Sequence, residues 1–146
     1  MELQFKELGI IDYERIAGID GRDKEYVRDA LVDDLPANMN FNEIACVMSH
    51  LKAMKNWLEK SNEDTLVIME DDCDMSTVNF WGFCWKDFAR GLPFHWDAVQ
   101  LAICNPNELV MGLHKHFAND YCSACYIIRR SYAQKLVNAH CRGECY

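Results

Sequence analysis

A short apolar stretch followed at once by a cluster of acids constrains this chain more than any other feature. Residues 66–69 are all apolar, and Glu70, Asp71, Asp72 and Asp74 place four carboxylates within the next five positions. A strand that is apolar on both faces is typical of the centre of a covered sheet. Ligands of open α/β sheets bind outside the carboxyl ends of the strands. The stretch therefore predicts a buried strand ending at a functional site, with a solvated acidic turn as the alternative.

Neighbouring carboxylates repel one another, so their charge has to be offset. A divalent cation is the simplest candidate, because it prefers oxygen ligands. The whole chain has a net charge of −8, and its lysines and arginines are scattered along the sequence. This distribution argues against a nucleic-acid partner. We therefore expect a metal site at the acids.

Helical and strand-like patterns alternate along the 146 residues. The clearest helix covers residues 41–60, where Asn40 and Glu43 have the spacing of a capping box. Other predicted helices cover residues 2–9, 76–90 and 131 onward, and predicted strands cover residues 10–21, 66–69, 97–103 and 124–128. Strands that alternate with helices indicate an α/β fold with a mainly parallel sheet. The length favours one domain, residues 1–146.

Two residue patterns leave alternatives open. Half of the eight cysteines have a spacing close to that of a zinc ribbon, namely Cys122, Cys125, Cys141 and Cys145. They are otherwise expected to be reduced thiols in the core. Aromatic residues also recur at helical spacing, namely Trp81, Trp85 and Phe88. This stripe predicts core packing or, as the alternative, a platform for a sugar.

The first residues, MELQFK, lack the features of a signal or transit peptide. No apolar run approaches the roughly 18 residues that a membrane span needs. We therefore expect a soluble, cytoplasmic protein with reduced cysteines, and leave assembly into a homo-oligomer open.

Several motifs occur in the order and spacing of one protein family. They read ERIAGIDG at 14–21, NEIACVMSHLKAM at 42–54, LVIMEDD at 66–72, WDAVQL at 96–101 and ACYIIRRSYAQKL at 124–136. Over roughly residues 8–140 the sequence resembles the family-25 glycosyltransferases, which include lipooligosaccharide and collagen galactosyltransferases.

The resemblance implies a GT-A type fold. This chain is expected to begin after the strand that comes first in the family. The resemblance also implies a nucleotide-sugar donor, such as a UDP-sugar, and transfer of a hexose (galactose or glucose) with inversion to a glycan or glycoprotein acceptor. Glu70 and Asp72 correspond to the outer acids of the family's metal motif, so they are expected to bind Mn²⁺ or Mg²⁺, with Asp72 central to catalysis.

The resemblance assigns further residues to the donor site, namely Ala17, Asp20, Gly21, Ser49, His50 and Asp71. An inverting transfer also needs a general base for the acceptor hydroxyl. No motif marks this base; Asp120 is a candidate, with a plain loop carboxylate as the alternative.

Two other functions fit part of the pattern. Asp72, Asp74 and Ser76 imitate the nucleophile motif of haloacid-dehalogenase-type phosphatases, although two acids already precede Asp72. The second is an inactive remnant of a transferase that binds sugar or metal, because the family's first strand is not found in this chain.

Overall fold

The computed structural model describes residues 1–34, 38–102 and 122–146. Contacts within the chain divide it into two compact units. The first unit combines Met1–Tyr13 with Val67–Ile128, and the second combines Glu14–Leu66 with Arg129–Tyr146.

The second unit is built on a long helix, α3, which spans Phe41–Lys60 as predicted. The expected capping box is present: the Asn40 side chain accepts from the backbone N–H of Asn42 and Glu43, and the Glu43 carboxylate accepts from the N–H of Asn40. These bonds satisfy donors that the first turn of a helix leaves without partners. The helix buries Ile44, Ala45, Met48, Leu51, Met54 and Trp57.

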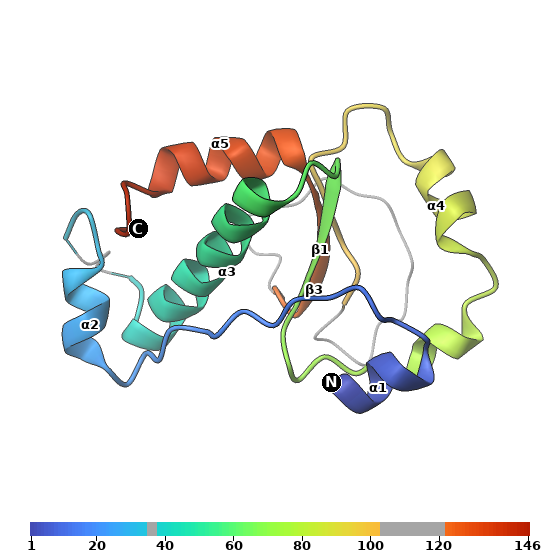
Figure 1. Cartoon of the computed structure of the whole chain (residues 1–146), viewed down its shortest axis with the longest axis horizontal. Coiled ribbons are helices and arrows are strands. Elements are labelled where there is room, and N and C mark those ends of the chain that lie inside the picture. Colours follow the sequence, from blue (N-terminus) through green and yellow to red (C-terminus); the bar gives the residue numbers. More distant parts are fainter. Residues whose placement is uncertain (35–37, 103–121) are drawn as a thin grey trace. The chain divides into compact units, whose positions relative to one another are not determined.

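Helix α5, Arg130–His140, packs along α3 (Figure 1). Its Ala133 side chain is fully buried. At the start of α5 the Arg130 guanidinium lies 4.9 Å from the ring centroid of Trp57 and donates from Nη2 to the carbonyls of Leu58 and Ser61. Arg130 therefore satisfies carbonyls at the end of α3 that have no partner within the helix.

A short helix, α2 (Lys24–Asp29), completes this unit. Val27 is fully buried, and it belongs to a core cluster with Ala30, Ile44, Ala45 and Met48. Tyr146 packs against this cluster, and its backbone N–H and carbonyl bond to Ala30 and Val32 at 2.8 and 2.9 Å.

The segment 10–21 is not a strand, contrary to the prediction. Its second half, residues 14–21, is held by side chains from one face of α3. The Ser49 hydroxyl accepts from the N–H of Ile19 at 2.8 Å, and Lys52 Nζ donates to the Ala17 carbonyl at 2.9 Å. Because helix side chains supply the partners, this backbone needs no neighbouring strand.

A three-stranded sheet in the order β1-β3-β2 lies mostly in the first unit. The strands are β1 (Thr65–Met69), β2 (Ala98–Gln100) and β3 (Cys125–Arg129). β2 is antiparallel to β3, with Val99 opposite Ile127. β1 is also antiparallel to β3, since the N–H of Glu70, at the end of β1, bonds to the carbonyl of Ala124, before the start of β3.

The described sheet is therefore antiparallel, and the prediction of a mainly parallel sheet is not supported by these strands. β1 and β2 do run in the same direction, as a crossover through a helix requires. However, β3 inserts between them in the opposite direction. β1 is thus an edge strand of the described sheet, and only Ile68 is buried while Val67 is 49% exposed.

The predicted helix 76–90 forms as two pieces, a 3₁₀ helix η1 (Ser76–Phe80) and helix α4 (Trp85–Gly91). The aromatic stripe is not core: Trp81 and Trp85 are 39% and 42% exposed. Instead, a chain of ring contacts joins Trp81, Phe83, Phe88 and Trp85, with centroids 5.4–5.5 Å apart. These rings bury one another and leave the cluster at the surface.

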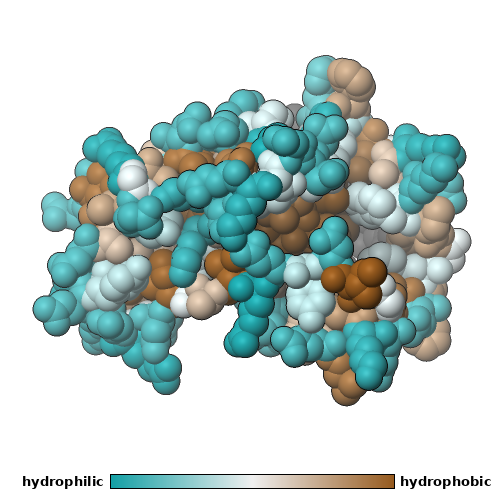
Figure 2. Space-filling view, in the orientation of Figure 1, coloured by the Kyte–Doolittle hydropathy of each residue, from teal (hydrophilic) through white to brown (hydrophobic). Residues whose placement is uncertain are grey.

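The first unit begins with helix α1, Glu2–Glu7, which ends before Gly9 at a φ of 69°. Figure 2 shows hydrophobic side chains at the surface around this segment, where Leu3 and Ile11 are 69% and 91% exposed. None of the described helices has both the length and the apolar composition needed to cross a bilayer.

Candidate functional site

The acidic turn, Glu70–Asp74, directly follows β1 in the first unit. Glu70 is fixed to the neighbouring strand segment at two points. Its N–H donates to the Ala124 carbonyl at 2.7 Å, and its carboxylate oxygen Oε1 accepts from the Ser123 hydroxyl at 2.5 Å. The N–H of Cys73 donates a hydrogen bond to the Glu70 carbonyl at 3.3 Å, and this bond closes the turn. Glu70 is thus a positioned carboxylate.

Asp71 and Asp72 are exposed. Within the described residues, no lysine or arginine forms an ion pair with either of them. Asp74 differs, because its carboxylate accepts from the N–H of Ser76 at 2.8 Å and from its hydroxyl at 3.0 Å. These two bonds lower the pKa of Asp74. Asp74 therefore stabilises the start of η1, while Asp71 and Asp72 are available to a ligand.

The turn offers the ligands that Mg²⁺ and Mn²⁺ prefer, namely carboxylate oxygens. In the described part of the chain, no three of its carboxylates converge into a closed cage. Such an open set suits a cation that is bound by one or two carboxylates and completed by substrate phosphates. Glu70 and Asp72 therefore fit the expected metal through their chemistry.

Three thiols lie beside the acidic turn in the same unit. Cys73 belongs to the turn, Cys125 opens β3, and Cys122 precedes it at a φ of 117°. Burial raises the pKa of Cys125 to about 12, and the neighbouring thiols of Cys73 and Cys122 add to this rise. Burial also raises the pKa of Cys73, against the effect of its hydrogen bond with Cys125. All three are free cysteines.

The other donor-site candidates lie in the second unit, on and beside α3. The Ser49 hydroxyl donates to the Ala45 carbonyl at 2.6 Å and accepts from Ile19, so it joins α3 to the segment that carries Ala17 and Asp20. His50, the next residue on α3, is half-buried. The structure thus gives Ser49 a structural contact, which leaves its predicted role in substrate binding as a prediction.

Gly21 lines a cavity at the N-terminal end of α3, and Asp20 precedes Gly21 in the chain. The Asp20 carboxylate pairs with Arg22, with 2.7 Å between Oδ2 and Nη2, and these hydrogen bonds lower the Asp20 pKa to about 2. Gly21 lies against α3 so closely that a β-carbon there would be 2.5 Å from Oδ1 of Asn42. Glycine is therefore the residue that lets this segment approach the helix.

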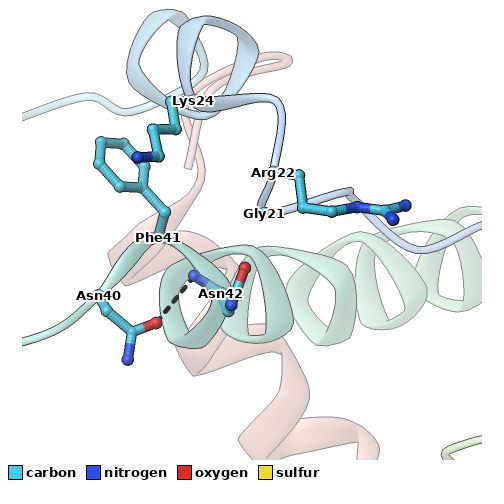
Figure 3. Close-up of a pocket in the computed structure, with 6 residues that line it drawn as sticks. All are labelled: Gly21, Arg22, Lys24, Asn40, Phe41 and Asn42. Carbon is cyan, nitrogen blue, oxygen red and sulfur yellow. Dashed lines mark hydrogen bonds between the residues drawn. The ribbon is translucent and has the colours of Figure 1, made fainter.

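The cavity has a volume of about 360 Å³. In Figure 3 the Phe41 ring lies beneath Lys24, whereas the Arg22 side chain points away from both. The Arg22 guanidinium bonds to the Asp20 carboxylate instead. The cavity is lined by Gly21, Arg22, Lys24, Asn40, Phe41 and Asn42. Sequence reasoning found only Gly21 among these residues, because the capping residues of a helix give no signal for a ligand.

The predicted site residues thus fall into two groups, one in each compact unit. Glu70, Asp71 and Asp72 lie in the first unit, and the residues from Ala17 to His50 lie in the second. Asp120, the predicted general base, lies outside the described residues. Ser123 was missed, because its contact with Glu70 depends on the antiparallel pairing of β3 with β1.

The four cysteines with zinc-ribbon spacing divide in the same way. Cys122 and Cys125 belong to the first unit, while Cys141 follows α5 and Cys145 forms a bridge with Arg142 in the second. Cys125 is a strand residue and Cys141 caps a helix, whereas Cys145 closes a tight turn with Arg142, so the first pair lacks the tight turn that a ribbon uses. The zinc hypothesis gains no support from these elements.

No curated protein and no solved structure matches the chain. A family model does: the one described as glycosyltransferase family 25 (LPS biosynthesis protein) matches residues 1–143. This match covers the acidic turn, the Ala17–Gly21 segment and the Ser49–His50 pair, and it replaces the phosphatase hypothesis. The chain therefore belongs to glycosyltransferase family 25.

Proposed function

We propose that the chain transfers a hexose, galactose or glucose, from a nucleotide-sugar donor to a hydroxyl of a glycan or glycoprotein acceptor, with a divalent metal ion and with inversion at the anomeric carbon. The observation that carries this proposal is the positioned Glu70 followed by the exposed Asp71 and Asp72, in a chain of family 25. A GT-A type fold is part of the same proposal. It is supported by the crossover from β1 to β2, with the acids at the carboxyl end of β1.

The acids of the turn have different proposed roles in binding the donor. Glu70 and Asp72 are the proposed metal ligands, because both are outer acids of the turn and Glu70 is held by Ser123 and Ala124. When bound there, Mn²⁺ or Mg²⁺ supplies positive charge for the diphosphate leaving group. Asp71 is exposed between them and is proposed to accept a hydrogen bond from a hydroxyl of the donor.

The transfer itself requires an acceptor alkoxide or its equivalent. A general base takes the proton of the acceptor hydroxyl as its oxygen bonds to the anomeric carbon and the bond to the diphosphate breaks. Attack from the face opposite the leaving group inverts that carbon. Asp120 remains the proposed base, as predicted from the sequence.

Calorimetric titration with UDP-galactose and UDP-glucose, each with and without Mn²⁺, tests the proposal. The informative variant is Asp72→Asn, which removes a charge and keeps the size of the side chain. Asp12→Asn is the matched control, because Asp12 is exposed in the same unit and far from the turn in sequence. We expect metal-dependent binding that weakens more than about tenfold in Asp72→Asn, as for loss of a direct or supporting metal contact, and stays unchanged in Asp12→Asn.

A folded protein that binds neither sugar nucleotide, with or without metal, would contradict the transferase. Binding without release of the sugar to water or to an acceptor would instead favour the inactive remnant. Slow hydrolysis of the donor, measured by release of UDP, separates these two functions because a remnant lacks turnover.

A further inference from the structure

The aromatic cluster of the first unit consists of Trp81, Phe83, Trp85 and Phe88, and the proposed transfer chemistry uses none of these residues. In the chain of ring contacts the two tryptophans stand at the ends and the two phenylalanines in the middle. The phenylalanines are half-buried, whereas Trp81 and Trp85 are 39% and 42% exposed. Each indole is therefore backed by a phenylalanine ring and keeps part of its surface in solvent.

The ring contacts fix the orientation of the indoles. Trp81 is stacked on Phe83, with centroids 5.4 Å apart and 16° between the ring planes, and Trp85 meets Phe88 at 5.4 Å and 40°. Contacts between aromatic rings stabilise a cluster beyond the area that they bury. Rings held in this way lose little further conformational entropy when a ligand binds. The two indoles are thus preorganised surface groups.

The exposed part of this segment is purely aromatic. Within residues 76–96, all of which the structure describes, the exposed large hydrophobic side chains are Phe80, Trp81, Trp85 and Phe94. An aromatic ring differs from an aliphatic side chain because its face carries partial negative charge, which attracts groups of partial positive charge. The C–H groups on one face of a pyranose ring are such groups. The composition therefore suits a sugar ring.

Polar side chains lie between the rings on α4. The Asp87 carboxylate accepts from the Cys84 thiol at 3.1 Å and lies 3.7 Å from Nη1 of Arg90. The side chains of Asp87 and Arg90 are 66% and 69% exposed. A carboxylate accepts hydrogen bonds from hydroxyl groups, and a guanidinium donates to them. Aromatic surface with a few polar groups is the usual composition of a small-molecule site.

The charges of the segment argue against two other occupants. Binding to an anionic membrane surface takes a cluster of about four to eight lysines and arginines. Residues 76–96 contain only Lys86 and Arg90, and Asp87 offsets one of these charges. The core of a protein–protein interface is depleted of charged residues, whereas Lys86 and Asp87 here separate Trp85 from Phe88 in the sequence. A carbohydrate is the occupant that both the rings and the charges favour.

We propose that the aromatic cluster binds a pyranose ring of the acceptor glycan, with Asp87 and Arg90 bonding to its hydroxyl groups. The assignment of this glycan as the acceptor rests on the proposed function. The cluster belongs to the same unit as the proposed metal ligands. The chain passes from the acidic turn directly into η1, where Asp74 holds Ser76.

Calorimetric titration with lactose, cellotetraose and maltotetraose, without metal or sugar nucleotide, tests the proposal. We expect binding that weakens about three- to tenfold in Trp81→Ala and in Trp85→Ala, as for the loss of one ring contact. Trp85→Phe keeps a ring and should retain most of the affinity. Tyr13→Ala is the matched control, because Tyr13 is 47% exposed in the same unit and contacts the Phe5 ring, outside the cluster. A circular dichroism spectrum of each variant confirms that it is folded.

Binding of none of the three sugars by the folded native protein, or an equal loss in Tyr13→Ala, would overturn the proposal. Sedimentation analysis covers the remaining occupant, a second copy of the chain. A dimer that dissociates in Trp85→Ala, in a protein that binds no sugar, would assign the cluster to self-association and would also overturn the proposal.

The titration with UDP-sugars and Mn²⁺ judges the proposed function separately. Binding of UDP-sugars without binding of the oligosaccharides would leave the transferase intact and overturn the role of the cluster. Binding of the oligosaccharides without binding of UDP-sugars would confirm the cluster as a carbohydrate site and overturn its assignment to an acceptor.

Discussion

The Ser123 hydroxyl donates a hydrogen bond of 2.5 Å to Oε1 of Glu70. The contact links Ser123, two residues before β3, to Glu70, the residue after β1, so it depends on the antiparallel pairing of the two strands. The hydroxyl fixes the position of the Glu70 carboxylate beside β3. Ser123 is therefore a positioning residue for the proposed metal site.

Replacement of Ser123 by alanine should weaken Mn²⁺ binding by about tenfold, as for the loss of an outer hydrogen bond to a metal ligand. Ser131→Ala is a suitable control, because Ser131 is exposed in the first turn of α5 and its side chain forms no capping bond there. Calorimetric titration of both variants with Mn²⁺ measures the effect. Unchanged affinity in Ser123→Ala would show that Glu70 does not depend on this contact.

Local signals in the sequence were sufficient for α3, whose cap and length follow from Asn40, Glu43 and the apolar spacing. They failed at residues 76–90, where the helix breaks into η1 and α4. Gly82 lies in the gap, and glycine costs a helix interior about 1 kcal/mol relative to alanine. The aromatic residues on either side then pack on one another, which keeps Trp81 and Trp85 at the surface.

The strand order of the sheet could not be predicted from the hydrophobic periodicity of the sequence. The alternation of strands and helices correctly placed β1 and β2 in the same direction, yet it does not specify which strand lies between them. Strand order depends on contacts between distant segments, such as Glu70 with Ala124. The acidic turn was predictable because it is continuous in sequence, whereas Ser123 and the cavity beside Gly21 come from tertiary contacts.

Ser49→Ala should lower the free energy of unfolding by about 1–3 kcal/mol, because it leaves the N–H of Ile19 without its partner. The substitution also removes the hydrogen bond from the Ser49 hydroxyl to the Ala45 carbonyl, which remains part of the helix backbone. Urea unfolding monitored by tryptophan fluorescence measures the change. Stability equal to that of the native protein, combined with weaker donor binding, would favour the predicted role of Ser49 in substrate binding over a structural one.

The Asp20 carboxyl should titrate at a lower pH than an ordinary aspartate, because its hydrogen bonds with Arg22 lower its pKa from 3.8 to about 2. A lowered pKa in the folded state means that the pair contributes stability above pH 3.8, and that this contribution is lost as the pH falls toward 2. The pair is exposed, so the contribution is small. Carbon-13 NMR of the carboxyl group gives the midpoint directly.

In Arg22→Gln the midpoint for Asp20 should rise toward 3.8. Lys24→Gln removes an equal charge from the same segment but leaves the pair of Asp20 and Arg22 intact, so its midpoint should stay near 2. Equal shifts in both variants would indicate a general effect of net charge in place of a specific pair.

Gly21→Ala should be strongly destabilising, because the added β-carbon would meet Oδ1 and Cα of Asn42 at 2.5 and 2.7 Å and the Phe41 carbonyl at 2.9 Å. Two of these atoms belong to the backbone of α3 and cannot move aside alone, so a cost of about 1–3 kcal/mol is expected. At Gly18 the same carbon would be 3.5 Å from the Ser49 oxygen, an ordinary contact, so Gly18→Ala is the control. Urea unfolding of both variants measures the difference. Equal midpoints would mean that the segment from Ala17 to Gly21 shifts freely on α3, and the cavity beside Gly21 would then lose its fixed wall.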